Sequence, residues 1–382
     1  MKLNPAYALF LAAALATSPA WAAKHKPARP ATQKDAAPFP ITRQVDLTEL
    51  AGFAAELAAT EGWDVNEVLP VLEQAQVVPA VQRLIMPPVA GKAKDWSAYR
   101  ALFIEPRRIQ AGVEFWQLHA AKLAEAESRY GVPAEVVMGV LGVETYYGRI
   151  MGNFRVIDAL ATLAFAFPTG RSDRSPFFRS ELAEFLKLAR REGADPLSYR
   201  GSYAGAMGLP QFMPSSWNRH AVDFDGSGHI DLIGNPDDAI GSVAHYLAEY
   251  GWQPGITTHY TVAMPADTTQ RARLLTPDVL PSFTAQQLVA TGARPSEAAM
   301  DFDGQLAVVE LQNGAKAASY VLGTQNFYAV TRYNHSSYYA MAVIELGRAV
   351  AAGYRAQSAV SAPASSAGQG PSVPAGDGRA NQ

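Results

Sequence analysis

The sequence contains no cysteine in its 382 residues. Disulfides, thiolate nucleophiles, cysteine-based zinc sites and lipid attachment at cysteine are therefore excluded. Excess charge of one sign is also lacking, with 32 Lys and Arg against 35 Asp and Glu. No basic patch or long charge run appears, which argues against a nucleic-acid partner. The seven histidines form no H-E-x-x-H zinc pattern. The 48% share of hydrophobic residues is ample for a core and indicates two or three structural units.

Long hydrophobic runs are lacking too, apart from a short one near the N-terminus. Lys2 precedes an apolar, Ala-rich stretch at 7–17, and Ala20-Trp21-Ala22 fits a small-x-small cleavage site. The run is too short for a comfortable membrane span of about 20 residues. We therefore predict a signal peptide over residues 1–22, with an uncleaved anchor as the alternative. The mature protein is expected to be exported, periplasmic and soluble, without a membrane anchor.

The rest of the chain predicts a mainly α fold. Residues 23–44 contain several prolines and are interpreted as a linker. Helical patterns follow in an accessory region at 45–130 and in a core at 131–256, and helix returns at 323–355. The tail, 356–382, consists of small and polar residues and is expected to be disordered. The clearest helices are expected at Glu49–Ala59, Ile109–Tyr130, Ser175 to Gly193, Asn235 to Gly251 and Ser337–Ala351.

Residues 257–322 differ from this helical pattern. His259–Met264 alternates like a strand. Leu306–Leu311 and Ser319–Leu322 flank Asn313-Gly314, which predicts a hairpin with a tight turn. We interpret the segment as a small β-containing insertion.

One carboxylate lies in the otherwise apolar segment Val137-Met-Gly-Val-Leu-Gly-Val-Glu-Thr-Tyr-Tyr-Gly148. Pro133 suits the first turn of a helix here, and Gly148 suits the left-handed residue after the last turn. Burial of an unpaired carboxylate is costly and raises its pKa, which would keep Glu144 protonated near neutral pH. A glycosidase needs such an acid to protonate a leaving oxygen. The residues that share one helix face are Val137, Val140, Leu141 and Glu144.

A structural explanation of Glu144 stays open at this point. The residue could be a helix-end glutamate that is solvated, or one paired with Arg149 or Arg155.

A second segment, 201–216, is rich in glycine and proline, which excludes regular structure through it. Its side chains combine amide and hydroxyl groups with aromatic faces, a mixture that suits the hydroxyls and C–H faces of a sugar. It lacks the Lys-Ser/Thr ending of a phosphate loop. The alternative is a tight connection between helices whose Met and Phe fill the core.

A third segment, Asp223-Phe-Asp-Gly-Ser-Gly-His-Ile-Asp231, matches the first half of an EF-hand calcium loop. Position twelve is Gly234 rather than Glu, so Asp237 or Asp238 would have to close the loop. The alternative is an Asx/Gly turn without a metal. Asp301-Phe-Asp-Gly304 repeats four letters but lacks the other ligands.

Aromatic and amide residues crowd a fourth segment, 326–339, which suits a glycan groove although core packing explains most of its tyrosines equally well. His335 has no obvious Ser or Cys nucleophile as a partner, so a hydrolase triad gains no support.

Taken together, these motifs resemble the lytic murein transglycosylase B family, glycoside hydrolase family 103. The resemblance runs from about 98 to 351 with the motifs in the same order. The motifs that carry it are Gly142-Val-Glu-Thr-Tyr-Tyr-Gly148, Gly205-Ala-Met-Gly-Leu-Pro-Gln-Phe-Met-Pro-Ser-Ser216, Asp223-Phe-Asp-Gly-Ser-Gly-His229 and Thr331-Arg-Tyr-Asn-His-Ser336.

The resemblance implies a lysozyme-like α core and cleavage of the β-1,4 bond between N-acetylmuramic acid and N-acetylglucosamine, leaving a 1,6-anhydro end. It implies that Glu144 is the single catalytic acid/base and that peptidoglycan strands, and other cell-wall enzymes as further candidates, are the partners. No cofactor is implied for catalysis, and Ca²⁺ would be structural. The implied glycan-groove residues are Tyr99, Ser202, Gln211, Phe212, Tyr246, Tyr333, Asn334 and Tyr339. The implied calcium ligands are Asp223, Asp225, Ser227, His229 and an Asp at 237 or 238.

Two features depart from the family pattern. The calcium loop is one residue longer before Asp-Ala-Ile-Gly-Ser242, and the lipidated cysteine of several members is absent. Two other functions stay open: a muramidase of the same fold that uses water, and a non-catalytic peptidoglycan-binding protein.

Overall fold

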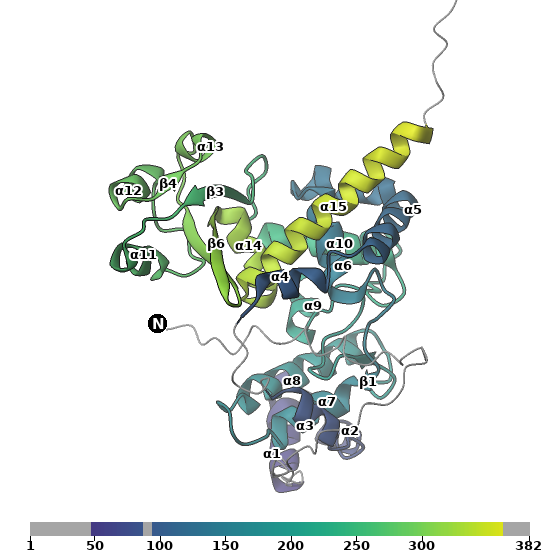
Figure 1. Cartoon of the computed structure of the whole chain (residues 1–382). Coiled ribbons are helices and arrows are strands. Elements are labelled where there is room, and N and C mark those ends of the chain that lie inside the picture. The colour runs from purple at the N-terminus through teal and green to yellow at the C-terminus, as the bar shows by residue number, and fades with distance from the viewer. Residues whose placement is uncertain (1–46, 87–93, 362–382) are drawn as a thin grey trace, which may run out of the picture.

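The structure, a computed structural model, describes residues 47–86 and 94–361. The expected signal peptide, the expected linker and most of the expected tail lie outside the described residues. Within them the chain forms fifteen helices and six short strands, which confirms the mainly α fold class (Figure 1). The helices are α1 Leu47–Glu61, α2 Val65–Leu72, α3 Pro79–Leu84, α4 Trp96–Ala101, α5 Pro106–Tyr130, α6 Ala134–Thr145, α7 Val156–Phe165, α8 Ser175–Arg191, α9 Pro214–His220, α10 Pro236–Glu249, α11 Thr268–Leu275, α12 Ala285–Ala290, α13 Glu297–Met300, α14 Gln325–Asn334 and α15 Ser337–Ser361. The strands are β1 Phe154–Arg155, β2 Arg200–Gly201, β3 His259–Ala263, β4 Arg294–Pro295, β5 Ala307–Asn313 and β6 Lys316–Gly323.

Helix α6 forms the centre of the core. Every residue of α6 except Glu135 is buried, so the helix is enclosed on all sides rather than on the single face that the spacing predicts. It packs against α5, α10 and α15. Glycines permit the close approach of α15: a Cβ on Gly139 would lie 2.1 Å from the carbonyl oxygen of Val343. No larger residue fits at this crossing.

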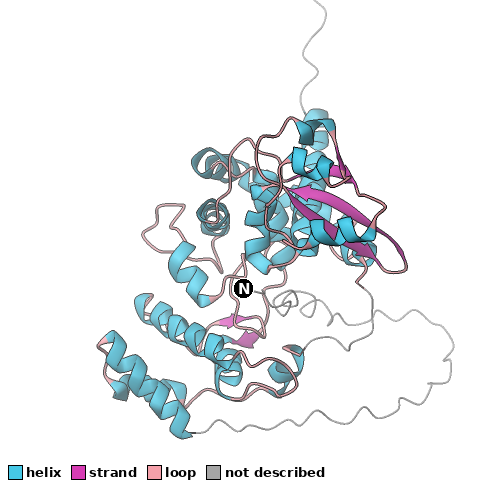
Figure 2. Ribbon diagram, turned by 90° about the vertical axis from the view of Figure 1, so that its left-hand side faces the viewer, coloured by secondary structure: helices cyan, strands magenta, loops and turns pink. Residues whose placement is uncertain are grey.

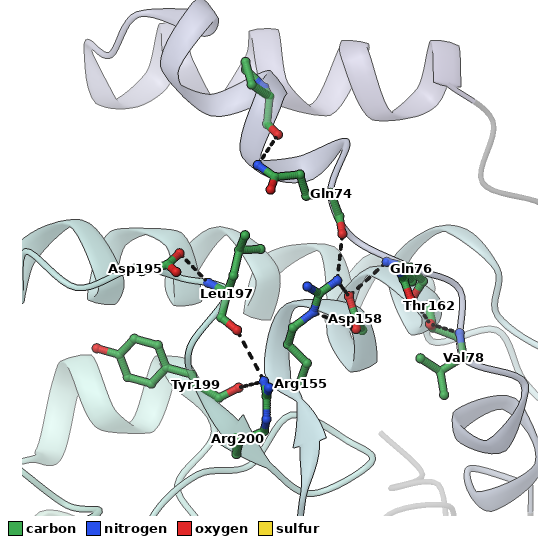
Figure 3. A network of polar contacts seen from close by, with 11 residues as sticks. Gln74, Gln76, Val78, Arg155, Asp158, Thr162, Asp195, Leu197, Tyr199 and Arg200 are labelled. Atoms are coloured by element: carbon green, nitrogen blue, oxygen red, sulfur yellow. Dashed lines mark hydrogen bonds and ion pairs between the residues drawn. The ribbon is translucent and has the colours of Figure 1, made fainter.

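A second helical lobe, at the bottom of Figure 1, contains α1, α2, α3, α7 and α8. A polar network joins its N-terminal helices to α7 (Figure 3). Asp158 pairs with Arg155 at 2.7 Å and accepts the backbone N–H of Gln76 at 2.9 Å. Arg155 also donates to the carbonyl oxygen of Gln74 at 2.7 Å. These contacts hold the segment between α2 and α3 against the start of α7.

The predicted insertion contains an antiparallel sheet of order β4-β3-β6-β5, drawn in magenta in Figure 2. The β5–β6 hairpin is confirmed, but Asn313 pairs with Lys316, so the turn lies at Gly314 and Ala315, one residue later than predicted. The insertion also holds three helices, α11 to α13, that the sequence pattern did not indicate. These helices and strands share a small core of their own, composed of Leu274, Ala285, Leu288, Ala293, Ala299, Leu306, Val308 and Leu322.

Several helix ends differ from the predictions. Helix α15 continues to Ser361, beyond the expected end at Ala351 and into the expected disordered tail. Helix α5 begins at Pro106, where the Glu105 carboxylate caps two backbone N–H groups. The predicted start of α10 is confirmed, because the Asn235 side chain accepts the N–H of Asp237 at 3.0 Å. The segment 201–216 is not irregular throughout, since Pro214 begins α9.

Candidate active site

Glu144 lies in the last turn of α6, and two left-handed tyrosines follow it. Pro133 is the N-cap of this helix rather than part of its first turn. The helix ends at Thr145 with Tyr146 as its left-handed C-cap (φ 54°). Gly148 is left-handed as predicted (φ 82°), but Tyr146 and Tyr147 (φ 58°) already adopt this backbone before it. Left-handed backbone is strained for residues other than glycine and is concentrated at functional sites. The turn after Glu144 is therefore a strained one.

Glu144 is 8% exposed, and among the described residues its carboxyl has one hydrogen-bond partner, the hydroxyl of Tyr339, which donates to Oε1 at 2.6 Å. Its Oε2 is buried and accepts no hydrogen bond from the described residues. Burial raises the pKa of Glu144 to about 8, and the hydrogen bond from Tyr339 opposes this shift. Glu144 is therefore protonated at neutral pH and can donate a proton.

The alternative ion pairs for Glu144 are not formed. Arg149 contacts Glu114 at 3.3 Å, and Arg155 contacts Asp158 at 2.7 Å. Neither cation therefore holds Glu144 in its charged form.

Glu144 opens into a cavity of about 290 Å³. Residues from α6, α8, α10, α14 and the loop after β2 line it. The predicted groove residues that line this cavity are Ser202, Gln211, Tyr246, Tyr333 and Asn334. Segments that are far apart in the sequence thus converge on one carboxyl group.

An aromatic stack forms one wall of the cavity. Tyr246 and Tyr333 lie 4.8 Å apart between ring centroids, and Tyr333 stacks on Tyr339 at 6.1 Å. Phe212 lies behind them, 5.5 Å from Tyr246. Aromatic faces of this kind suit the C–H faces of a sugar ring.

The loop that follows β2 is held by its own polar side chains. Ser202 Oγ accepts the backbone N–H of Ala206 at 3.0 Å. Gln211, itself left-handed at φ 50°, donates through Nε2 to the carbonyl oxygens of Gly208 and Met151 at 2.9 and 3.1 Å. Both side chains therefore shape the loop as well as line the cavity.

Three predicted groove residues do not line this cavity. Phe212 and Tyr339 are buried in the wall behind it. Tyr99 packs edge-on against Tyr338 and lies over Phe103, at centroid distances of 5.9 and 5.2 Å. Burial and, to a lesser extent, the negative charge of an ionised Glu144 raise the pKa of Tyr99.

The cavity is also lined by titratable residues that were not among the predicted groove residues. Glu181 of α8 is buried and accepts the N–H and hydroxyl of Ser215 at 3.0 and 2.7 Å. Burial raises its pKa. Arg174 and His335 line the same cavity. The spacing of Glu181 beside the apolar stripe of its helix was the available signal for it, since a charged residue there must be buried or paired.

The predicted calcium loop folds around three carboxylates. Ligand oxygens of Asp223, Asp225 and Asp238 lie within 4.8 Å of one another. Asp238 is fully buried and accepts the N–H groups of Phe224 and Asp231 at 2.7 and 2.8 Å. Asp237 instead contacts His119 at 3.2 Å. The geometry therefore favours Asp238 over Asp237 as the closing residue.

Two further predicted ligands lie in the same loop. The hydroxyl of Ser227 donates to the carbonyl oxygen of His229 at 3.0 Å. The imidazole of His229 contacts Glu192 at 3.1 Å, which leaves the backbone carbonyl oxygen of His229 as its oxygen donor in the loop. Carboxylate, hydroxyl and carbonyl oxygens are the donor set that Ca²⁺ prefers.

A buried carboxyl with a raised pKa beside an aromatic cavity, in a mainly helical core, is the arrangement expected of a glycan-cleaving enzyme of the lysozyme-like class. Residues 46–348 match the family described as "Transglycosylase SLT domain". The chain belongs to this family, and the predicted lytic transglycosylase activity and lysozyme-like fold are confirmed.

Individual relatives show which members of the family the chain resembles. The chain is 41% identical over 307 residues to "Membrane-bound lytic murein transglycosylase B" of Escherichia coli, covering 78% of this chain and 81% of that one. It is similar to the crystal structure of soluble lytic transglycosylase SltB1 from Pseudomonas aeruginosa (TM-score 0.72, 41% identity, 81% and 99% of the two chains). It is also similar to Escherichia coli Slt35 in complex with calcium (TM-score 0.69, 39% identity, 80% and 93% of the chains).

The membrane-bound description belongs to the relative. Among residues 47–86 and 94–361, the helices are too short or too polar to cross a bilayer.

Proposed function

We propose that Glu144 is the single catalytic acid/base of a peptidoglycan lytic transglycosylase that leaves 1,6-anhydromuramic ends. The observation that carries the proposal is the buried, protonated carboxyl of Glu144 at the cavity with the aromatic wall. The family's reaction needs an acid that holds its proton near neutral pH.

Glu144 acts twice in this mechanism. Its O–H donates a proton to the glycosidic oxygen as the bond to muramic C1 breaks. The resulting Glu144 carboxylate then accepts the proton of the muramic C6 hydroxyl, whose oxygen attacks C1 and closes the anhydro ring. No water is consumed. The substrate's own N-acetyl group would stabilise the oxocarbenium-like state, and the hydroxyl of Tyr339 holds the carboxyl in position.

The position of Glu181 supports this mechanism over a muramidase. Ordinary glycosidases place two carboxyl groups at the scissile bond. Glu181 lines the same cavity, but its two carboxyl oxygens accept the N–H and the hydroxyl of Ser215. We therefore assign Glu181 to holding Ser215 and both proton transfers to Glu144.

The substrate contacts of the proposed site come from the lining residues. Tyr246 and Tyr333 would stack on the sugar rings of a peptidoglycan strand, and Ser202, Gln211 and Asn334 would contact its hydroxyl and acetamide groups. Tyr99, Phe212 and Tyr339 would act from behind or beside these residues.

We infer a structural Ca²⁺ in the loop that contains Asp223, Asp225 and Asp238. The Ser227 hydroxyl and the His229 carbonyl are further oxygen donors to the ion. The complex of the similar Slt35 with calcium supports this inference.

We also propose a periplasmic location. The signal-like pattern at residues 1–22 supports export, and peptidoglycan, the proposed substrate, lies outside the cytoplasmic membrane.

Mass spectrometry of muropeptides released from purified sacculi tests the proposal. The expected products carry anhydromuramic ends, lighter by one water than reducing ends. Reducing ends would instead show a muramidase, and no release would favour a non-catalytic binding protein.

A further inference from the structure

A buried arginine, Arg108 of α5, lies against the end of the helix that carries Glu144. It is 4% exposed, and its Nη1 donates to the carbonyl oxygen of Gly142 in α6 at 2.6 Å. Its guanidinium stacks on the ring of Tyr146, 4.5 Å from the centroid, and lies 5.4 Å from that of Phe103. Burial of a cation is costly, and the proposed reaction does not use Arg108 directly. Its contacts point to another role.

The contacts of Arg108 converge on the strained turn. The carbonyl oxygen of Gly142 also accepts the N–H of Tyr146 at 3.2 Å. Tyr146 and Tyr147 both adopt left-handed backbone, which costs about 1–2 kcal/mol per residue for side chains other than glycine. The hydrogen bond and the stacking of Arg108 stabilise this conformation from one side.

Tyr147 is held from the other side. A Cβ on Gly112 or Gly142 would lie 2.4 Å from its hydroxyl oxygen, so two glycines make room for this ring. The turn is thereby fixed between α5 and α6, which pack against each other. Because Glu144 precedes Tyr146 by two residues, the turn also fixes where the carboxyl lies relative to Tyr339.

We propose that Arg108 is a positioning residue for Glu144, acting through the carbonyl of Gly142 and the ring of Tyr146. This inference rests on the proposed function. The effect we propose is geometric: Arg108 contacts Gly142 and Tyr146, whereas burial raises the pKa of Glu144 and the hydrogen bond from Tyr339 opposes that shift. A small misplacement of a catalytic group costs up to about 100-fold in rate.

The test uses the mature protein with Arg108→Ala and Arg108→Lys, assayed on soluble glycan strands. We expect kcat to fall by roughly 10- to 100-fold in both variants, with KM and the alkaline limb of the pH profile unchanged. Lysine keeps the charge but lacks the planar guanidinium, so it should not restore kcat. Arg190→Ala is the matched control, because Arg190 also stacks on an aromatic ring, that of Trp63 at 4.8 Å, but lies on α8. Its kcat should match the wild type.

Chemical rescue separates positioning from general destabilisation. Added methylguanidinium should raise the kcat of folded Arg108→Ala, whereas methylammonium at the same concentration should not. Unchanged kcat in Arg108→Ala, a shifted alkaline limb, or no rescue of the folded variant would each overturn the proposal.

If Arg108→Ala does not fold, a double-mutant cycle with Arg108→Lys and Tyr146→Gly tests the proposal instead. Glycine adopts left-handed backbone without strain, so Tyr146→Gly should reduce the kcat penalty of Arg108→Lys. If Arg108→Lys lowers kcat as much in the Tyr146→Gly background as in the wild type, the proposal is contradicted. Wild-type protein is assayed on the same strands, and its failure to produce anhydromuramic ends would refute the proposed function instead.

Discussion

Two buried carboxyl groups of this protein, Glu144 and Asp238, have opposite surroundings. Asp238 accepts two backbone N–H groups, from Phe224 and Asp231, at 2.7 and 2.8 Å. Glu144 accepts only the hydroxyl of Tyr339, and its second oxygen has no hydrogen-bond donor among the described residues. The hydrogen-bond donors around a buried carboxyl group therefore decide its role. Asp238 holds a loop together, whereas Glu144 keeps a proton available for transfer.

The helix ends strengthen this difference. Asp238 lies in the first turn of α10, where the partial positive charge of the helix N-terminus favours an anion. Glu144 lies in the last turn of α6, where the partial negative charge disfavours one. At Asp238 the helix end and two backbone N–H donors both favour a negative charge, whereas at Glu144 the helix end disfavours one and, of the described residues, only Tyr339 donates a hydrogen bond.

The largest effect is expected from removing the transferable proton. Glu144→Gln should lower kcat by about 10³-fold or more, since general acid–base groups contribute roughly 10²–10⁴-fold. Release of anhydromuropeptides measures this loss, and a pull-down with intact sacculi should show that binding survives. Cleavage at the wild-type rate would remove Glu144 from the mechanism.

The same variant has a stability signature. The pKa of Glu144 is raised from 4.5 to about 8 on folding, so wild-type stability falls as pH rises from 4.5 to about 8. Glu144→Gln avoids this loss, and at pH 7 it should be more stable by about 3 kcal/mol. Denaturant unfolding at pH 5 and pH 7 checks the prediction. A stability difference that does not grow with pH would contradict the raised pKa.

Asp238→Asn should remove the carboxylate that holds the predicted calcium loop together. We expect a loss of about 3 kcal/mol, because bound Ca²⁺ at 100 times its dissociation constant stabilises by about 2.7 kcal/mol. Thermal melts with added calcium and with chelator measure the effect. The calcium response should vanish in Asp238→Asn and persist in Asp237→Asn, the matched control. A wild-type Tm that is insensitive to both additions would exclude the calcium site.

Tyr339→Phe should have the smallest effect. It removes the one hydrogen-bond donor that Glu144 has among the described residues. The hydrogen bond from Tyr339 lowers the pKa of Glu144, so its removal raises that pKa further. Because the protonated form is the active one, activity is lost as pH rises through about 8 in the wild type and at higher pH in the variant. We expect kcat at neutral pH to fall about 10-fold through poorer positioning of the carboxyl. A pH–rate profile measures both changes. An alkaline limb that moves to lower pH in Tyr339→Phe would contradict the effect of this hydrogen bond on the pKa of Glu144.

Much of this organisation could be predicted from the sequence. The Asn235 cap and the alternation at His259–Met264 are local signals, and they indicated the start of α10 and the strand β3. Four motifs in order indicated the family. Local signals failed where packing decided the outcome: Gly148 is left-handed as expected, but the left-handed backbone already begins at Tyr146, which no local signal indicated.

The sequence by itself determined which chemical groups are available: one carboxyl in an apolar helix, a loop dense in oxygen donors, aromatic residues and no thiol. Only the tertiary structure decided how these groups are paired. It placed Glu181 in the same cavity yet bound it to Ser215, chose Asp238 over Asp237, and set Arg108 against Gly142. The physical reason is that burial and hydrogen-bond partners, which fix charge and position, come from segments far apart in the chain.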